Sequence, residues 1–151
     1  MTLQRTTSDD LHFKYLSNEL EQELKLRDGD QHIFYAELNK IDNLPYVIVA
    51  YKDGLPVGCG GLREYNKNVV EIKRMFVKPQ HRGHRIATVI LTELEKWSAA
   101  LGYKYCLLET GKNQPEAMGL YTKNKYTVIP NFGKYADSEN SICFEKAIQV
   151  I

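Results

Sequence analysis

A basic turn at the start of a helical pattern is the segment whose residue types and spacing best suit chemistry. It reads Val77-Lys78-Pro79-Gln80-His81-Arg82-Gly83-His84-Arg85 and leads from an apolar run into Ile86 and Ala87. A helix N-terminus offers unpaired backbone N–H groups and the positive end of the helix dipole, and the guanidinium and imidazole groups add charge. Gly83 lets the backbone approach a ligand closely. The segment therefore predicts an anion site, best suited to a pyrophosphate group.

Two other phosphate loops are excluded by their spacing. Neither G-x-x-x-x-G-K-[ST] nor G-x-G-x-x-G occurs in the chain, so the turn is neither a Walker loop nor a dinucleotide fingerprint. Taken alone, the segment also fits a solvated basic turn before an ordinary helix.

Two motifs in register resemble those of one enzyme family. Gln80-x-x-Gly83 at a helix start is similar to the acetyl-CoA signature Q/R-x-x-G-x-G/A of the GNAT superfamily of N-acetyltransferases. One helix and one strand later, Asn113-x-x-x-Ala117-x-x-Leu120-Tyr121-x-x-x-x-Tyr126 resembles the second conserved block of that family. The resemblance spans Val69 to roughly Val128. It implies one N-acetyltransferase domain over residues 1–151, with an α/β (α+β) fold in which a mixed, mostly antiparallel sheet is flanked by about four helices.

Two positions depart from the family pattern. Arg85 stands where the family prefers Gly or Ala, although Ala87 follows two residues later. The Arg85 side chain must point away from the phosphates or bind them, and we favour the second. Lys125 stands where relatives carry a helix-ending glycine. Because asparagine tolerates the left-handed conformation, we expect Asn124 to cap that helix.

The resemblance implies acetyl transfer from acetyl-CoA to a primary amine by direct attack in a ternary complex, with no metal. In the family, strand backbone groups hold the pantetheine and turn amides hold the pyrophosphate. The corresponding residues here are Met75, Val77, Arg82, Gly83, His84, Arg85 and Ala87, with Asn113 as a further cofactor contact. Tyr121 falls at the position of the family's general acid, and Glu71 lies where some members place a general base. Glu109, at the end of the next strand, is a competing base and could instead bind a cationic acceptor.

Several of these residues also have a structural interpretation. Tyr121 could be a core tyrosine, Asn113 a plain helix N-cap and Glu71 an exposed strand carboxylate. Two histidines, His12 and His32, have no motif context, and we expect them to be structural or surface groups. The sequence also places Cys59 and Cys106 in apolar strands, which disfavours an acetyl-cysteine intermediate.

Periodicity predicts the elements that carry these residues. Leu16, Leu20 and Leu24 form the stripe of a first helix that is capped by Ser8 or Thr7 and ends near residues 28–30. Asp53-Gly54 between two β-rich runs predicts a hairpin. We expect strands at residues 46–51, 56–63, 69–77, 105–109, 127–129 and 142–145, and further helices from Ile86 to a Gly102 end and from Pro115.

Composition limits the class of protein. A chain of 151 residues with 43% apolar residues fits one globular domain with its own core. Twenty basic and nineteen acidic side chains leave a formal charge of +1, which predicts no overall attraction to nucleic acid or to an anionic membrane. The sequence has no apolar run of membrane-spanning length, no secretory signal pattern and no C-x-x-C pair. We therefore expect a cytoplasmic protein without disulfides or a zinc site.

Other functions fit the same motifs. A GNAT fold that senses acyl-CoA without turnover is one, and a protein-lysine or N-terminal acetyltransferase is another. Nucleic-acid binding is disfavoured by the balanced charge, although basic residues are available for it: Lys73, Arg74, Lys78, Arg82 and Arg85. Residues 27–30 and 130–135 occupy the family's acceptor-wall positions. Their mixture of aromatic, basic and acidic groups suits a small amine, with or without its own carboxylate. A homodimer is expected by resemblance only.

Overall fold

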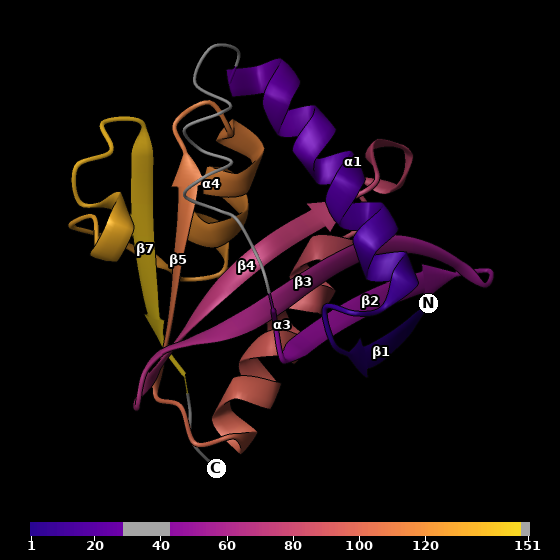
Figure 1. Cartoon of the computed structure of the whole chain (residues 1–151), viewed down its shortest axis with the longest axis horizontal. Coiled ribbons are helices and arrows are strands. Elements are labelled where there is room, and N and C mark those ends of the chain that lie inside the picture. Colours follow the sequence, from indigo (N-terminus) through magenta and orange to yellow (C-terminus); the bar gives the residue numbers. More distant parts are fainter. Residues whose placement is uncertain (29–42, 149–151) are drawn as a thin grey trace.

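Seven strands form one sheet in the order β1-β2-β3-β4-β5-β7-β6 (Figure 1). The computed structural model describes residues 1–28 and 43–148. Its strands are β1 (Thr2–Thr6), β2 (Tyr46–Lys52), β3 (Leu55–Asn66), β4 (Val69–Val77), β5 (Tyr105–Gly111), β6 (Thr127–Ile129) and β7 (Ser141–Ala147). Its helices are α1 (Leu11–Asp28), α3 (Ile86–Ala100) and α4 (Pro115–Lys123), with short 3-10 turns η2 (Pro79–His81) and η3 (Gly133–Tyr135). Among the described strands, only β4 and β5 pair in parallel, so the expected mixed, mostly antiparallel sheet is confirmed.

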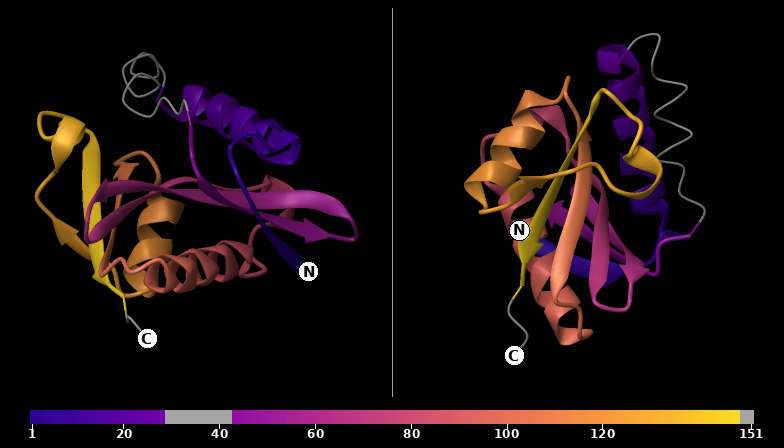
Figure 2. Two further views of the ribbon diagram at one scale, coloured as in Figure 1. Left: turned by 60° about the horizontal axis from the view of Figure 1, so that its bottom comes forward. Right: turned by 90° about the vertical axis from the view of Figure 1, so that its left-hand side faces the viewer.

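Helices cover both faces of the sheet (Figure 2). Leu16 of α1 is fully buried against one face, and Ile90 and Leu94 of α3 are fully buried against the other. Gly60 of β3 allows α3 to approach closely. A Cβ at that position would lie 2.5 Å from the Met75 sulfur and 2.9 Å from Leu94 Cδ1. A side chain at this point of β3 would therefore displace Met75 and Leu94.

Helix α1 begins at a different cap from the one expected. The Asp10 carboxylate accepts hydrogen bonds from the backbone N–H groups of His12 and Phe13, at 2.9 and 3.0 Å. Asp10 is therefore the N-cap, and the prediction of Ser8 or Thr7 was wrong. Strand β1 was not expected either, because its five residues alternate little and lie at the edge of the sheet.

Most of the other expected boundaries are confirmed. Asp53 and Gly54 both have positive φ, 53° and 79°, as the tight β2–β3 hairpin requires. The end of α4 differs from the expectation. Lys125 takes the left-handed conformation at φ 72°, whereas Asn124 stays at φ −93° and donates its side-chain amide to the carbonyl oxygen of Leu120 at 2.8 Å. Asn124 is thus the C-cap of α4, as expected, but the left-handed conformation that suggested it falls on Lys125.

Strands β4 and β5 separate after a short parallel pairing. They pair only over residues 69–71 and 105–107. Further along β4, Arg74 and Met75 lie opposite the single residue Gly60, and Arg74 has a φ of 60°. This β-bulge turns the second half of β4 relative to its neighbour β3. The resulting gap between β4 and β5 is where the cavities described below open.

Candidate active site

Two cavities adjoin where β4 and β5 separate. The larger, of about 490 Å³, is bounded by the end of β4, the turn after it, α3 and α4. The smaller, of about 130 Å³, is bounded by β4, β5, α1 and η3. The same five residues line both cavities: Leu20, Met75, Gln114, Ala117 and Tyr121. A ligand extending along the larger cavity would therefore reach the smaller one at Met75 and Tyr121.

The larger cavity gathers most of the residues predicted to bind the cofactor. It is lined by Met75, Val77, Arg82, Gly83, Arg85 and Ala87. Gly83 has a φ of 85°, which favours glycine. A Cβ added there would meet nothing within 4 Å, so the preference comes from the backbone conformation and not from crowding. Arg85, with a φ of 65°, directly precedes α3, whose first backbone hydrogen bond runs from Val89 N–H to the Arg85 carbonyl.

Two predicted cofactor residues lie elsewhere. His84 and Asn113 are exposed and line neither cavity. Gln114, one residue after Asn113, lines both cavities instead and stands at the N-cap position of α4. Its side-chain nitrogen is buried and makes no hydrogen bond within the described part of the chain. The motif match pointed to Asn113, and only the start of α4 shows which neighbour faces the site.

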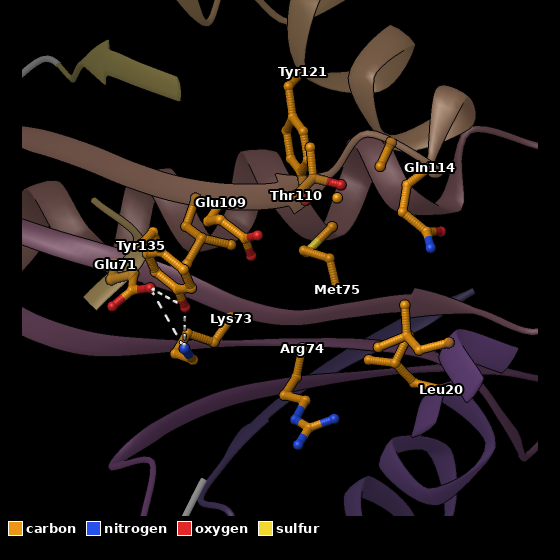
Figure 3. Close-up of a pocket in the computed structure, with 14 residues that line it drawn as sticks. Leu20, Glu71, Lys73, Arg74, Met75, Glu109, Thr110, Gln114, Tyr121 and Tyr135 are labelled. Atoms are coloured by element: carbon orange, nitrogen blue, oxygen red, sulfur yellow. Dashed lines mark hydrogen bonds and ion pairs between the residues drawn. The ribbon is translucent and has the colours of Figure 1, made fainter. Parts of the chain in front are cut away.

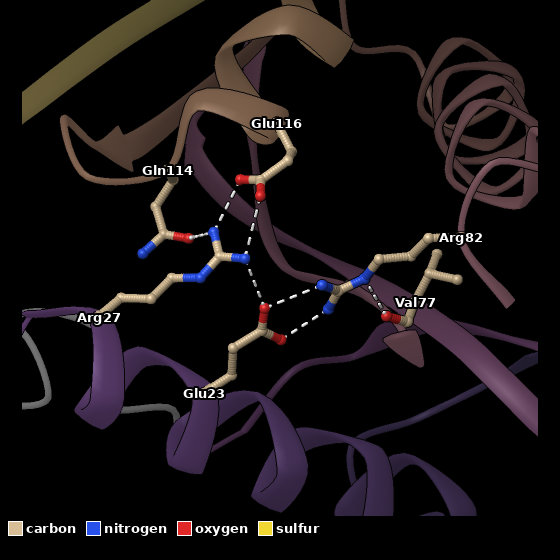
Figure 4. A network of polar contacts seen from close by, with 6 residues as sticks. All are labelled: Glu23, Arg27, Val77, Arg82, Gln114 and Glu116. Carbon is tan, nitrogen blue, oxygen red and sulfur yellow. Dashed lines mark hydrogen bonds and ion pairs between the residues drawn. The ribbon is translucent and has the colours of Figure 1, made fainter. Parts of the chain in front are cut away.

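Arg82 is held by contacts with Glu23 and Val77 (Figure 4). Its Nε donates to the Val77 carbonyl at 2.9 Å, and its two terminal nitrogens donate to the Glu23 carboxylate of α1 at 3.0 and 2.6 Å. Its backbone N–H donates to the Pro79 carbonyl at 3.3 Å. Arg82 lines the larger cavity, and its hydrogen bonds to Glu23 connect the basic turn to α1.

Arg27 extends this ion-pair network from α1 to α4. Its guanidinium donates to the Glu116 carboxylate at 2.8 and 3.2 Å and to the side-chain oxygen of Gln114 at 2.9 Å. It also lies 3.0 Å from the carboxylate of Glu23. Helix α1 is thus tied to both walls of the larger cavity, the basic turn and the first turn of α4. The remainder of the expected acceptor wall, Gly29 and Asp30, lies outside the described residues, as does His32.

Tyr121 stands at the junction of the two cavities. It lies on α4, with 5% of its surface exposed, and its ring contacts those of Tyr126 and Phe144 at centroid distances of 5.7 and 5.8 Å. Burial, together with the nearby Glu109 carboxylate, raises the pKa of the Tyr121 hydroxyl. The phenol therefore keeps its proton at neutral pH, as a proton donor must.

The smaller cavity contains a buried triad that sequence reasoning missed. Lys73 Nζ donates to the Tyr135 hydroxyl at 3.0 Å and lies 3.4 Å from Glu71 Oε2, and the Tyr135 hydroxyl donates to that same oxygen at 3.2 Å. Burial lowers the pKa of Lys73 to about 8, against the opposing effect of Glu71. Glu71 is thus not the exposed strand carboxylate of the alternative interpretation. The two-residue spacing could have indicated the Glu71–Lys73 pair. The resemblance placed residues 130–135 in the acceptor wall, and Tyr135 does line this cavity, but its contact with the pair was not expected.

Glu109 faces the cavity between the triad and Tyr121 (Figure 3). It lies on β5, and Ser141 of β7 donates to its Oε2 at 2.6 Å. Of the two carboxylates that line this cavity, Glu109 is the one directed toward the junction. The carboxylate of Glu71 is instead held by Lys73 and Tyr135.

The described residues give little support to cysteine-based or metal-based chemistry. The three cysteines are buried and line neither cavity, and burial raises the pKa of both Cys59 and Cys106 to about 12. Within residues 1–28 and 43–148 no His, Cys, Asp and Glu side chains form a group that could hold a metal ion. No helix in the described part of the chain has the length and apolar character to cross a membrane.

The basic residues considered for nucleic-acid binding do not form an open stripe. Four of the five lie within ion-pair distance of a carboxylate, in the pairs Lys73–Glu71, Arg74–Glu21, Lys78–Glu19 and Arg82–Glu23. Their charges are therefore largely neutralised within the protein.

Comparison with known proteins assigns the family. The acetyltransferase (GNAT) family model matches residues 10–126. An IAA acetyltransferase from Azospirillum brasilense is 35% identical over 102 residues, which is 67% of each chain. A crystal structure assigned to the acyl-CoA N-acyltransferases, from Klebsiella pneumoniae, is 26% identical with a TM-score of 0.83, covering 98% of this chain and 97% of the other.

A further solved structure bears on the fold. An aminoglycoside 6'-N-acetyltransferase complexed with coenzyme A aligns with a TM-score of 0.70 over 99% of this chain and 98% of the other, at 18% identity. The seven-stranded sheet that opens between β4 and β5 is thus the fold of a coenzyme A-binding acetyltransferase. The chain belongs to the GNAT family and is an acyl-CoA-dependent N-acetyltransferase.

Proposed function

We propose that this enzyme transfers the acetyl group of acetyl-CoA to the primary amine of a small molecule, within a ternary complex. The observation that carries the proposal is the junction of the two cavities at Met75 and Tyr121. There a thioester entering from the larger cavity would meet an amine held in the smaller one. The names of two relatives, an IAA acetyltransferase and an aminoglycoside acetyltransferase, support a small-molecule acceptor.

The residues of the larger cavity fit acetyl-CoA. Its volume of about 490 Å³ lies in the range usual for ligand sites. Beyond Glu71 the edge of β4 is no longer paired with β5, so backbone groups near Met75 and Val77 can hold the pantetheine arm. The first amides of α3 precede its first internal hydrogen bond and, with Gly83 and Arg85, suit a pyrophosphate. His84 would contribute its backbone amide, and Asn113 stays a weaker candidate than Gln114.

The smaller cavity, called the acceptor cavity from here on, supplies groups for both proton transfers. When bound, acetyl-CoA supplies the thioester; attack by the neutral amine forms the C–N bond and breaks the C–S bond. We assign Glu109 as the acceptor of the proton that the amine loses, because its carboxylate faces the junction. Tyr121 would give its proton to the departing sulfur. Since Glu71 Oε2 already lies against Lys73 and Tyr135, we assign Glu71 to holding that pair rather than to the base role considered first.

Thermal unfolding with acetyl-CoA tests the cofactor site first. A ligand that binds only the folded protein raises its stability by RT ln(1 + [L]/Kd), about 2.7 kcal/mol at a hundredfold excess over Kd. We expect a clear rise in Tm with acetyl-CoA and a smaller one with inorganic pyrophosphate. No shift at millimolar acetyl-CoA would contradict the cofactor site.

Thiol release with a panel of amines then tests catalysis. We expect Tyr121→Phe to keep the Tm shift and to lower kcat by about a hundredfold, the effect of losing a positioned acid. Tyr126→Phe is the matched control, because Tyr126 is also buried on this side of the sheet but lines neither cavity. Binding without thiol release for any amine would instead support a non-catalytic acyl-CoA sensor.

A further inference from the structure

The inner end of the acceptor cavity is crowded with positive charge. Lys73 and Lys134 both lie near one aromatic ring, with their Nζ atoms 5.7 and 5.6 Å from the ring centroid of Tyr135. On the neighbouring strand, Arg63 stands directly opposite Glu71 in the β3–β4 register. Lys73 lines this end of the cavity together with Glu71, and Lys134 and Arg63 add positive charge close to Lys73.

This crowding is unfavourable in the absence of a further anion. Lys73 is 5% exposed, and a buried ammonium group costs free energy even when it has a partner. After burial and the opposing effect of Glu71, the cations Lys134 and Arg63 lower the pKa of Lys73 further. Lys73 can donate three hydrogen bonds, and its contacts with Tyr135 and Glu71 account for two of them. A negatively charged ligand group beside Lys73 would relieve the repulsion and take the third.

The opposite end of the same cavity has the other polarity. Glu109 and the hydroxyl of Tyr121 line it near the junction, where the proposed function requires the acceptor amine. Its volume of about 130 Å³ is well below the roughly 300–1,000 Å³ of sites for drug-sized ligands. The cavity therefore suits a small molecule with a positive group at one end and a negative group at the other.

We propose that the acceptor is a small amino acid-like molecule whose carboxylate binds Lys73 and whose amine lies beside Glu109. This inference rests on the proposed acetyl transfer and narrows its substrate class. Lys134 would strengthen the carboxylate site from the exposed side of η3. The same cations would repel amines that carry several positive charges, such as polyamines and aminoglycosides.

Matched pairs of amines test the proposal. Thiol release is measured with L-phenylalanine against phenethylamine and with L-lysine against cadaverine, each pair differing by one carboxylate. We expect kcat/KM to be at least tenfold higher for the carboxylate-bearing member of a pair that is turned over. In Lys134→Gln this ratio should fall several-fold with the rate for the decarboxylated member unchanged. Lys134 is exposed, so the variant should fold, and the exposed Lys52→Gln at the β2–β3 hairpin is the control.

The outcomes distinguish a failure of the carboxylate site from a failure of the proposed acetyl transfer. Equal kcat/KM for both members of every pair, or a preference for cadaverine, would overturn the carboxylate site and leave the acetyl transfer intact. A ratio that Lys134→Gln leaves unchanged would also overturn it. If no amine on the panel supports thiol release while acetyl-CoA still raises the Tm, the proposed function fails, and the acceptor class fails with it.

Discussion

Glu23 of α1 and Arg82 of the basic turn form a two-pronged ion pair, with N–O distances of 3.0 and 2.6 Å. Arg82 directly precedes Gly83 and lines the larger cavity, where its guanidinium is paired with Glu23 of the same lining. The basic turn is therefore held by the helix that also forms a wall of the smaller cavity. We infer that Arg82 acts as a positioning residue, and we assign phosphate binding to Arg85 and the first amides of α3.

A double-mutant cycle on this pair tests that assignment. We expect Glu23→Gln and Arg82→Gln to be coupled by about 0.5–1 kcal/mol in the free energy of unfolding, because the pair is partly exposed to solvent. Glu23→Gln should not raise the KM for acetyl-CoA, since it removes no contact to phosphate. Denaturant unfolding and steady-state kinetics give both quantities. A large rise in KM for Glu23→Gln with unchanged stability would contradict a purely positioning role.

Arg85→Gln should weaken cofactor binding without changing the chemical step. Arg85 is exposed, lines the larger cavity and directly precedes α3, so a phosphate there would accept a charge-assisted hydrogen bond. We expect the KM for acetyl-CoA to rise about five- to tenfold, with kcat within twofold of the wild-type value. Arg5→Gln, on β1 and outside both cavities, is the control. An unchanged KM would mean that the Arg85 side chain points away from the phosphates.

Lys73 should make stability depend on pH in the alkaline range. Its pKa is about 8 in the folded protein, below its ordinary value of 10.5, chiefly because burial disfavours the charged form. Between those two values the unfolded chain binds more protons, so stability rises with pH across that window. The gain should be on the order of 1–3 kcal/mol and absent in Lys73→Met.

Urea unfolding at pH 7.5, 8.5 and 9.5 measures this effect. The difference in unfolding free energy between wild type and Lys73→Met should move in favour of the wild type as pH rises. The exposed Lys52→Met should show no such trend. A difference that stays constant over these pH values would mean that Lys73 is not perturbed in the folded protein.

Two glycine substitutions should act in opposite directions. In Gly60→Ala the new methyl would lie 2.5 Å from the Met75 sulfur and 2.9 Å from Leu94 Cδ1, so we expect a loss of about 1–2 kcal/mol. Because Met75 lines both cavities, its displacement should also lower kcat/KM. Gly119→Ala meets nothing within 4 Å on helix α4 and should raise stability by about 0.5–1 kcal/mol. Equal effects of the two substitutions would contradict the close packing of α3 at Gly60.

Features set by neighbouring residues could be predicted from the sequence. The positive φ of Asp53 and Gly54, the extent of β4 and the Pro115 start of α4 depend on contacts within a few residues, and each was expected. Residues of the basic turn and Tyr121, which the resemblance assigned to one site, line the larger cavity together. The sequence pattern could not decide which of two neighbouring residues takes the left-handed conformation at the end of α4, Asn124 or Lys125.

The partners of the site residues were decided by the tertiary structure alone. Lys73 and Tyr135 are 62 residues apart, Glu23 and Arg82 are 59 apart, and Arg27 and Glu116 are 89 apart. Such contacts depend on how α1, η3 and α4 pack around the opening between β4 and β5, and no short-range pattern encodes that packing. The sequence by itself thus determined the fold, the family resemblance and the position of the basic turn before α3. Only the packed structure decided that Glu71 is enclosed, that Glu109 faces the junction and that Arg82 binds a helix, because burial and charge pairing arise between elements distant in the chain.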